Sequence, residues 1–256
     1  MIDVHCHLEQ PDYDRDRWEV IESLKGKVKA VITCCANPKN WDITLEMVKR
    51  YRGFIYASAS IHPLYIKDYG EKDEREKYYR LIAENRDMIV AVGETGLDYH
   101  WVKEDEWRAV QEEMFREHIS LARKLGLPLI IHSRNSNERV IEVLESEGVR
   151  NVDMHMFGDR KFVSRIVDNG WYISFNTMVL TSKAYRKTAR DTPLDRLLLE
   201  TDSPWLDPNK GRNTPASIRL VAMKIAEIKK IDFEEVWRSA CINANRLFKL
   251  GVTCQV

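Results

Sequence analysis

The sequence predicts one (β/α)8 TIM barrel of the α/β class, a single domain over residues 1–256. Short apolar or β-branched runs alternate with longer amphipathic segments from one end of the chain to the other, which is the pattern of repeated βα units. Single barrels often have this length, so 256 residues do not require a second domain. No internal repeat, low-complexity tract or Pro/Gly/Ser-rich linker interrupts the pattern.

The strands are predicted from short runs rich in valine, isoleucine, leucine and aromatic residues. These runs cover residues 2–8, 28–34, 54–60, 88–94, 127–132, 151–155, 171–175 and 196–200. Because a helical pattern separates most consecutive runs, we expect a parallel barrel built from eight βα units.

The helices are predicted from amphipathic or charged segments between and after these runs. The clearest are residues 39–50, 104–125, 135–147, 215–230 and 233–250. Pro38 precedes the first, and Gly126 and Gly148 follow the second and third, as expected at helix ends. The charged stretch 71–77 is expected to be a solvated loop or the start of a helix.

Charge and targeting signals narrow the class of protein. Lys+Arg and Asp+Glu both number 40, which argues against a polybasic nucleic-acid coat and against an acidic tail. The chain shows neither a basic leader followed by an apolar stretch nor an 18-residue apolar run, so we expect no secretion signal and no membrane span. These features favour a cytoplasmic enzyme without an obligate protein partner.

The cysteines are odd in number and lack C-x-x-C spacing. They are Cys6, Cys34, Cys35, Cys241 and Cys254. Neither a disulfide framework nor a structural zinc finger is indicated, and we expect reduced, buried thiols.

His5 and His7 stand two residues apart in the opening run MIDVHCHLEQ. Residues i and i+2 of a strand face the same side, so both imidazoles should aim at one point, as a metal site requires. Two strand histidines can also be half-buried groups that bond to the backbone, so this pair alone does not establish a metal site.

Further metal-binding side chains follow the other predicted strands. Active sites of parallel barrels lie at the carboxyl ends of the strands. Four histidines and two carboxylates are expected to meet there: His5, His7, Glu94, His132, His155 and Asp202. Six such groups exceed the needs of one ion and suit two divalent ions, Zn, Mn or Mg, sharing a carboxylate.

Glu94 is the expected bridge between the two ions. His5, His7 and Asp202 would complete one ion, and His132 and His155 the other. Each residue alone could be an ordinary hydrogen-bonded group at a strand end, but six together favour a metal centre.

Five motifs resemble the TatD family of metal-dependent deoxyribonucleases. They are DVHCHL, IHP at 61–63, GETGLDY at 93–99, PLIIHSR at 128–134 and LLLETDSPWL at 197–206, in order over nearly the whole chain. The resemblance implies an amidohydrolase-like metal barrel whose ligands fall on the same six residues. The chain differs from the common family pattern at His155-Met156-Phe157-Gly158-Asp159 and at Phe175-Asn176-Thr177-Met178, in loops that shape the substrate pocket.

Three residues near these motifs are candidates for supporting roles. His62 could hydrogen-bond a scissile phosphate or protonate a leaving oxygen, or it could only order the loop before Pro63. Arg134 could bind a phosphate or form an ion pair within its loop. Glu200 is expected to support Asp202 from the same strand face.

Several other polar or aromatic residues have simpler interpretations. The basic residues Lys183, Arg186, Lys187 and Arg190 share one helix face, which is by default a solvated face and otherwise a nucleic-acid track. Tyr99, Trp101 and Trp205 could stack on bases, although aromatic residues at a barrel rim commonly serve packing. His118 is expected to be structural.

The favoured function is hydrolysis of phosphodiester bonds in DNA, from a single-stranded or exposed 3′ end, by a two-metal mechanism. A water would attack phosphorus in line, with Asp202, Glu94 and His62 as the catalytic residues and Asp202 accepting the proton. The DNA substrate follows from the resemblance. The six-ligand site would equally serve an amidohydrolase or lactonase acting on a small molecule, and a non-catalytic protein braced by its metals is a third alternative.

Overall fold

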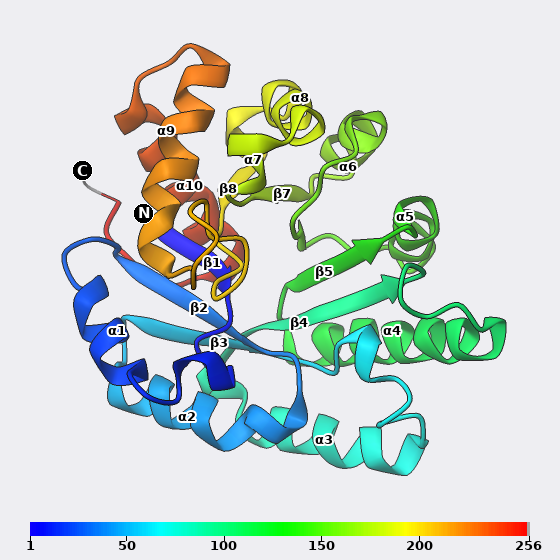
Figure 1. Ribbon diagram of the computed structural model, residues 1–256. Coiled ribbons are helices and arrows are strands. Elements are labelled where there is room, and N and C mark those ends of the chain that lie inside the picture. Colours follow the sequence, from blue (N-terminus) through cyan, green and yellow to red (C-terminus); the bar gives the residue numbers. More distant parts are fainter. Residues whose placement is uncertain (255–256) are drawn as a thin grey trace.

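The computed structural model describes residues 1–254 and shows the predicted barrel (Figure 1). Eight strands form one sheet in sequence order, and each neighbouring pair is parallel. They are β1 (Ile2–Cys6), β2 (Ala30–Cys35), β3 (Ile55–Ala59), β4 (Ile89–Asp98), β5 (Leu129–Arg134), β6 (Val152–Met154), β7 (Tyr172–Phe175) and β8 (Leu197–Leu199). The predicted fold class is confirmed, with every strand within a few residues of its predicted range.

Helices surround the strands and connect consecutive ones (Figure 1). They are α1 (Arg17–Leu24), α2 (Trp41–Arg50), α3 (Lys72–Glu84), α4 (Asp105–Leu125), α5 (Asn137–Ser146), α6 (Val163–Asp168), α7 (Met178–Thr181), α8 (Lys183–Asp191), α9 (Ile218–Lys229) and α10 (Phe233–Phe248). Gly126 ends α4 with φ 64°, a left-handed conformation that glycine adopts without a steric penalty. The charged stretch at 71–77 is the start of α3.

The barrel is completed where the chain after β8 meets β1. The Asp202 N–H donates to the His5 carbonyl at 3.0 Å, and the His7 N–H donates to the Ser203 carbonyl at 2.7 Å. Both bonds involve predicted metal ligands or their neighbours. The seam of the barrel therefore holds the first and last of the predicted ligands side by side.

Apolar side chains fill the barrel below the carboxyl ends of its strands. Ile2 and Val4 of β1 cluster with Ile32 of β2, Ile130 of β5 and Leu198 of β8. Strands from opposite parts of the ring contribute, so this cluster occupies the barrel interior, whereas a larger cluster packs the sheet against the helices. Because alternate strand residues share a face, residues two positions further along these strands point into the mouth of the barrel.

His118 joins α4 to the ends of two strands. It is fully buried, its Nε2 accepts the Ile61 N–H at 3.3 Å, and its Nδ1 lies 2.8 Å from Thr95 Oγ1. Burial lowers the pKa of His118 to about 3, with Glu117 opposing the shift and Arg75 adding to it. These contacts agree with the structural role predicted for this residue.

We expect His118 to make folding sensitive to acid. Its pKa in the folded chain lies below its ordinary value of 6.5, so its contribution to stability is complete above pH 6.5 and is lost as the pH falls toward 3. The full loss amounts to about 5 kcal/mol. Urea unfolding between pH 7 and pH 4 should show a smaller loss of stability in His118→Asn than in the wild type, and parallel pH profiles would contradict the expectation.

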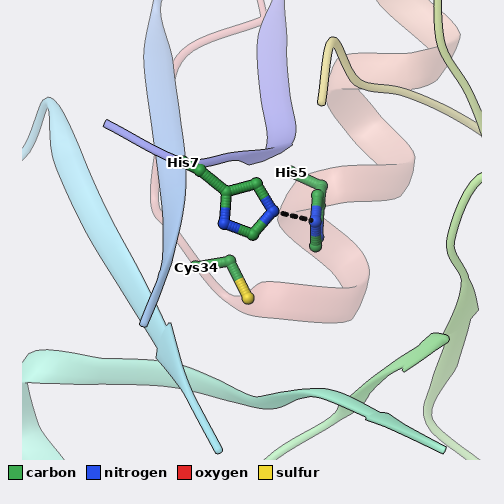
Figure 2. Close-up of side chains that lie close together, drawn as sticks. All are labelled: His5, His7 and Cys34. Carbon is green, nitrogen blue, oxygen red and sulfur yellow. Dashed lines mark hydrogen bonds between the residues drawn. The ribbon is translucent and has the colours of Figure 1, made fainter. Parts of the chain in front are cut away.

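Three cysteines are free and buried, as predicted: Cys6, Cys34 and Cys35. Cys34 extends from β2 toward the two histidines at the start of the chain, and Figure 2 shows the three side chains facing one another. Cys35, the next residue, contacts the Asn37 carbonyl and the Tyr78 hydroxyl. Neighbouring thiols thus lie on opposite faces of one strand.

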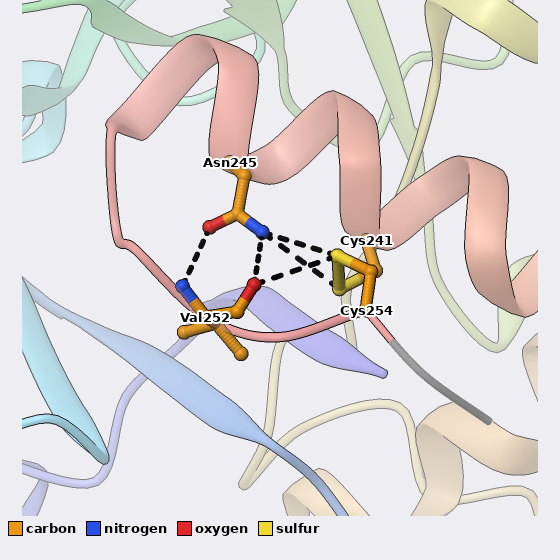
Figure 3. The surroundings of a disulfide bond; sticks show 4 residues. All are labelled: Cys241, Asn245, Val252 and Cys254. Atoms are coloured by element: carbon orange, nitrogen blue, oxygen red, sulfur yellow. Dashed lines mark hydrogen bonds between the residues drawn. A yellow bond between two sulfur atoms is a disulfide. The ribbon is translucent and has the colours of Figure 1, made fainter.

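The prediction that all cysteines are reduced is wrong for Cys241 and Cys254, which form a disulfide (Figure 3). After α10 the chain turns back along the helix, and the Asn245 side chain accepts the Val252 N–H at 2.9 Å and donates to the Val252 carbonyl at 2.6 Å. These bonds bring Cys254 beside Cys241, with Cα atoms 5.6 Å apart. The pairing depends on this reversal, which the spacing of the cysteines does not reveal.

None of the helices formed by residues 1–254 is long and apolar enough to cross a membrane.

Candidate metal centre

A cleft of about 590 Å³ opens at the carboxyl ends of the strands. Its lining includes seven of the predicted site residues: His7, His62, Glu94, His132, Arg134, His155 and Asp202. His5 is fully buried just beneath it. A second cavity of similar size contains none of these residues and lies at the opposite, amino ends of the strands, where Ile55 of β3 and Ile89 of β4 line it. The predicted ligands therefore converge in one cleft.

Glu94 is the central carboxylate of the cleft. Its Oε1 lies 2.7 Å from His132 Nδ1, 3.4 Å from His62 Nε2 and 3.7 Å from His155 Nε2. Its Oε2 lies 3.4 Å from His5 Nε2 and 3.8 Å from His7 Nε2. The two oxygens of one carboxylate thus face different groups of histidines.

Close packing of β4 against β5 places Glu94 beside His132. Gly93 precedes Glu94 and Gly96 follows it two residues later. A Cβ atom at Gly93 would lie 2.6 Å from Ile130 Cβ, and a Cβ atom at Gly96 would clash with the His132 carbonyl oxygen. Neither position has room for a larger residue. The Ser60 hydroxyl further holds the Glu94 backbone by donating to its carbonyl at 2.6 Å.

Asp202 faces His5 of β1 and His7, which follows that strand. Its Oδ1 lies 3.5 Å from His7 Nε2 and 3.7 Å from His5 Nε2, and these two nitrogens are 3.0 Å apart. The His5 ring stacks on His155 with centroids 3.7 Å apart, and His155 Nε2 lies 4.0 Å from Asp202 Oδ1. His155 therefore lies between the two predicted ion positions rather than beside His132 alone.

Three buried carboxylates hold the rings of the predicted ligands, and sequence reasoning missed two of them. Glu9 Oε1 lies 3.0 Å from His7 Nδ1, and Asp98 Oδ2 lies 3.0 Å from His132 Nε2. Such contacts fix which ring nitrogen faces an ion. Glu9 continues the alternation of His5 and His7, so the same pattern could have predicted that it lies near them.

Glu200 was predicted to support Asp202, and this prediction is wrong. Its Oε2 lies 2.8 Å from His155 Nδ1, and its Oε1 accepts the Met156 N–H at 3.0 Å. Glu200 therefore holds His155 instead of Asp202. β8 ends at Leu199, so the two residues do not share a regular strand face as the alternation assumed.

Electrostatics keep both predicted carboxylate ligands ionised. Burial alone would raise the pKa of Glu94, but the imidazoles of His62, His155 and His132 outweigh it and hold that pKa well below its usual range. The pKa of Asp202 is likewise lowered, because His7, His155 and His5 outweigh burial. An ionised carboxylate pair among imidazoles is a donor set that fits divalent ions.

The histidines of the cleft fall into two groups. Burial would lower the pKa of His132, but its contacts with Asp98 and Glu94 raise it to about 9. Glu9 and Asp202 likewise outweigh burial and raise the pKa of His7 well above its ordinary value. Burial dominates at His5 and His62 and lowers both pKa values. Ligation requires neutral imidazoles, so ions compete with protons at His7 and His132.

His62 both orders its loop and faces the cleft. Its Nδ1 accepts the Leu64 N–H at 3.1 Å, at the start of the short helix Pro63–Tyr65. The neutral ring therefore carries its proton on Nε2, which points toward Glu94 Oε1. The loop-ordering interpretation of His62 is therefore confirmed, and its catalytic role stays a prediction, for which the neutral ring presents a hydrogen-bond donor to the cleft.

Arg134 lies exposed at the rim of the cleft. Its guanidinium stands over the Trp101 ring at 5.6 Å from the centroid. Within residues 1–254 it forms no ion pair, so the alternative of a salt bridge within the loop finds no support there. The cation remains available to an anionic ligand.

The aromatic residues near the mouth differ in exposure. Trp101 is 60% exposed and Trp205 45% exposed, and the Trp205 ring lies 4.7 Å from that of His7. Tyr99 packs beneath the Arg108 guanidinium at 4.7 Å and has a packing role. Of the three, the two tryptophans are the exposed ones, and stacking of a base on either stays a prediction.

Three of the four predicted basic residues of α8 lie on the outer side of that helix, and the fourth, Arg186, is half-buried and donates to the Leu180 carbonyl. Thr188 and Ala189 are buried, whereas Lys183, Lys187 and Arg190 are exposed. On the inner side, the Tyr185 hydroxyl donates to the Met156 carbonyl in the cleft at 3.1 Å. The basic face is therefore directed away from the cleft, which favours the interpretation as a solvated surface.

Comparisons with known proteins agree with this geometry. Residues 2–249 match the family model described as TatD related DNase. The chain is 36% identical to the metal-dependent hydrolase YabD of Bacillus subtilis, over 98% of this chain and all of that protein, and 32% identical to the human deoxyribonuclease TATDN3, over 97% and 94%. The crystal structure of the TatD homologue YjjV of Escherichia coli superposes with a TM-score of 0.88 at 25% identity, covering 97% of this chain and 98% of that one. The chain is therefore an enzyme of the TatD family of metal-dependent hydrolases.

Proposed function

We propose that this enzyme is a deoxyribonuclease that hydrolyses phosphodiester bonds with two divalent ions, acting in the cytoplasm on a single-stranded or exposed 3′ end. Residues 1–256 would act as one domain. The observation that carries the two-metal proposal is the split of Glu94, whose Oε2 faces His5 and His7 while its Oε1 faces His132 and His155. A shared carboxylate is the usual bridge where two ions act together.

Each predicted ligand would bind one or both of the ions. His5, His7 and Asp202 would hold one ion, His132 the other, with Glu94 shared and His155 within reach of both. When bound, the ions supply Lewis acidity and lower the pKa of a water. Zn, Mn and Mg are candidate ions because the donors are imidazole and carboxylate groups.

Proton and charge handling would fall to the chain's own side chains. Asp202, kept ionised by the histidines around it, would accept the proton of the attacking water. Neutral His62 would donate a hydrogen bond from Nε2 to a phosphoryl or leaving oxygen. Arg134 would pair with a phosphate at the rim, where two charge-assisted hydrogen bonds are possible.

The DNA substrate is supported by Arg134, which forms no ion pair within residues 1–254, by the exposed Trp101 side chain next to it, and by the deoxyribonuclease named among the relatives. The competing function is an amidohydrolase or lactonase with the same metal centre acting on a small neutral molecule. That substrate would have no use for a cation at the rim of the cleft.

A substrate panel separates these functions. The metal-loaded enzyme should hydrolyse a labelled single-stranded oligonucleotide with a free 3′ end, should be slowed by a blocked 3′ end, and should leave amides and lactones intact. Hydrolysis of the small molecules without cleavage of any oligonucleotide would reject the deoxyribonuclease. Equal cleavage of free and blocked ends would reject the 3′ preference alone.

Binding of the oligonucleotide is expected to depend only weakly on salt. The net charge is zero and the basic face of α8 points away from the cleft, so about two to four phosphates should be engaged. Each contributes roughly 0.7 to the log-log slope on single strands, which gives a slope of about 1.5 to 3 in magnitude. Arg134→Ala should lower the slope by about 0.7 and weaken binding regardless of base sequence.

The measurement is a salt titration of binding with Ca²⁺ as a non-hydrolysing ion. Lys187→Ala on the outer side of α8 is the matched control and should leave the slope unchanged. An unaltered slope in Arg134→Ala would assign Arg134 a structural role, and a reduced slope in Lys187→Ala would identify α8 as a nucleic-acid track.

A further inference from the structure

A thiol lies beside the two histidines that open the chain. Cys34 Sγ and one ring nitrogen each of His5 and His7 lie within 4.8 Å of one another, and Figure 2 shows the sulfur below the pair. All three side chains are buried, with Cys34 fully so. The sulfur is therefore part of the wall around the position where the first ion is proposed.

The strand register explains why the thiol faces this point. β1 and β2 are neighbouring parallel strands. Ile32 of β2 packs inside the barrel, and Cys34, two residues further on, shares its face at the level of the histidines. The placement follows from the fold and does not need a special loop.

The distances are close to those of a bound ion. A tetrahedral zinc with Zn–N of about 2.1 Å and Zn–S of about 2.3 Å sets its nitrogen and sulfur ligands about 3.6 Å apart. The observed donors lie within 4.8 Å, so closure needs a movement of about 1 Å at most. His5 Nδ1 has no hydrogen-bond partner within residues 1–254, so the His5 ring is less constrained than that of His7, which Glu9 holds.

A sulfur donor changes which ions such a site prefers. Imidazole and carboxylate groups accept many divalent ions, whereas thiolate selects thiophilic ones. Catalytic zinc sites can combine cysteine with histidine and keep one position open for water or substrate. Mg²⁺ and Mn²⁺ gain little from sulfur.

We propose that Cys34 is a direct sulfur ligand of the ion held by His5 and His7, and that it makes this position selective for Zn²⁺ over Mn²⁺ and Mg²⁺. Binding forms one sulfur–metal bond and breaks the S–H bond, and the proton leaves to solvent. The proposal rests on the metal centre proposed above, and it adds a ligand to that centre.

Cobalt substitution tests the sulfur bond directly. Metal-free enzyme titrated with Co²⁺ should develop the near-ultraviolet charge-transfer band of a single thiolate–cobalt bond, together with the visible bands of cobalt bound to nitrogen and oxygen. Cys34→Ser should lose the charge-transfer band and keep the visible ones. Cys35→Ser is the matched control, because its thiol faces the other side of β2, and it should behave as wild type.

Affinity supplies a second measurement. The ratio of Zn²⁺ to Mn²⁺ affinity should fall about tenfold or more in Cys34→Ser, on the scale seen for loss of groups that support a metal. Cys34→Ala replaces the serine variant if circular dichroism shows that the latter is unfolded. An unchanged ratio would overturn the proposal.

The outcomes separate this inference from the metal centre itself. Visible cobalt bands without a charge-transfer band in the wild type would overturn the Cys34 ligand while leaving the centre in place. A charge-transfer band that survives in both Cys34 variants would assign the bond to another thiol and would also overturn it. Absence of any cobalt binding would reject the proposed centre as a whole.

Discussion

Replacing Asp202 with asparagine is expected to lower turnover about a hundredfold or more while leaving the fold intact, which is the usual scale for loss of a positioned acid or base. Asparagine has nearly the same volume but cannot accept the proton of the attacking water, and it is a weaker metal ligand. Asp202 also has φ 58°, a left-handed conformation that asparagine tolerates better than most residues. The substitution therefore removes charge without forcing the backbone to change.

The measurement is turnover of the oligonucleotide substrate with metal occupancy determined on the same sample. Asp195→Asn is a suitable control, because this exposed aspartate lies just before β8 and its side chain forms an ion pair with Arg196, which is not a predicted ligand. Turnover of Asp202→Asn within a few-fold of wild type, at equal occupancy, would mean that another group takes the proton.

The positions of the predicted ligands could be obtained from the sequence because they depend on local rules. Strand alternation places His5 and His7 on one face, and a parallel barrel brings the strand ends together. Glu94 and His132 meet because the glycines around Glu94 allow β4 to approach β5, a feature already visible in the motif GETG. Short-range pattern and fold class were sufficient for this part of the site.

The carboxylates that hydrogen-bond to the predicted ligands could not all be predicted from strand alternation and fold class. Glu200 contacts His155, 45 residues earlier in the chain, because β6 and β8 both end early and their following segments converge. The disulfide between Cys241 and Cys254 likewise depends on the path of the chain after α10. Such contacts are set by tertiary geometry, and residue spacing does not encode them.

The position of Cys34 beside the predicted ligands could not be predicted from the sequence pattern alone. Alternation from Ile32 would place its side chain inside the barrel, but only the register of β2 against β1 shows that it reaches the level of His5 and His7. A thiol there distinguishes the two ion positions, since no cysteine belongs to the group of donors formed by His62, Glu94 and His132 in residues 1–254. The two positions are therefore expected to differ in metal preference.

Glu94→Gln is expected to reduce bound metal from two ions per chain to one or none and to lower turnover at least as much as Asp202→Asn. Glutamine keeps the length of the side chain but provides one carbonyl oxygen, so it cannot face both histidine groups with anionic oxygens as Glu94 does. It also removes the negative charge that the histidines around it stabilise. Loss of groups that only support a ligand already costs about 10- to 100-fold in affinity, and loss of the shared ligand should cost more.

Elemental analysis and anomalous scattering under saturating metal measure the number and position of the ions. Glu104→Gln, an exposed glutamate paired with Lys67, is the control and should retain both ions. Two ions in Glu94→Gln would show that the carboxylate is not the bridge. A single ion at full occupancy in the wild type, with His132 and His155 unliganded, would also contradict the shared-carboxylate centre. The second group of donors would then bind no metal.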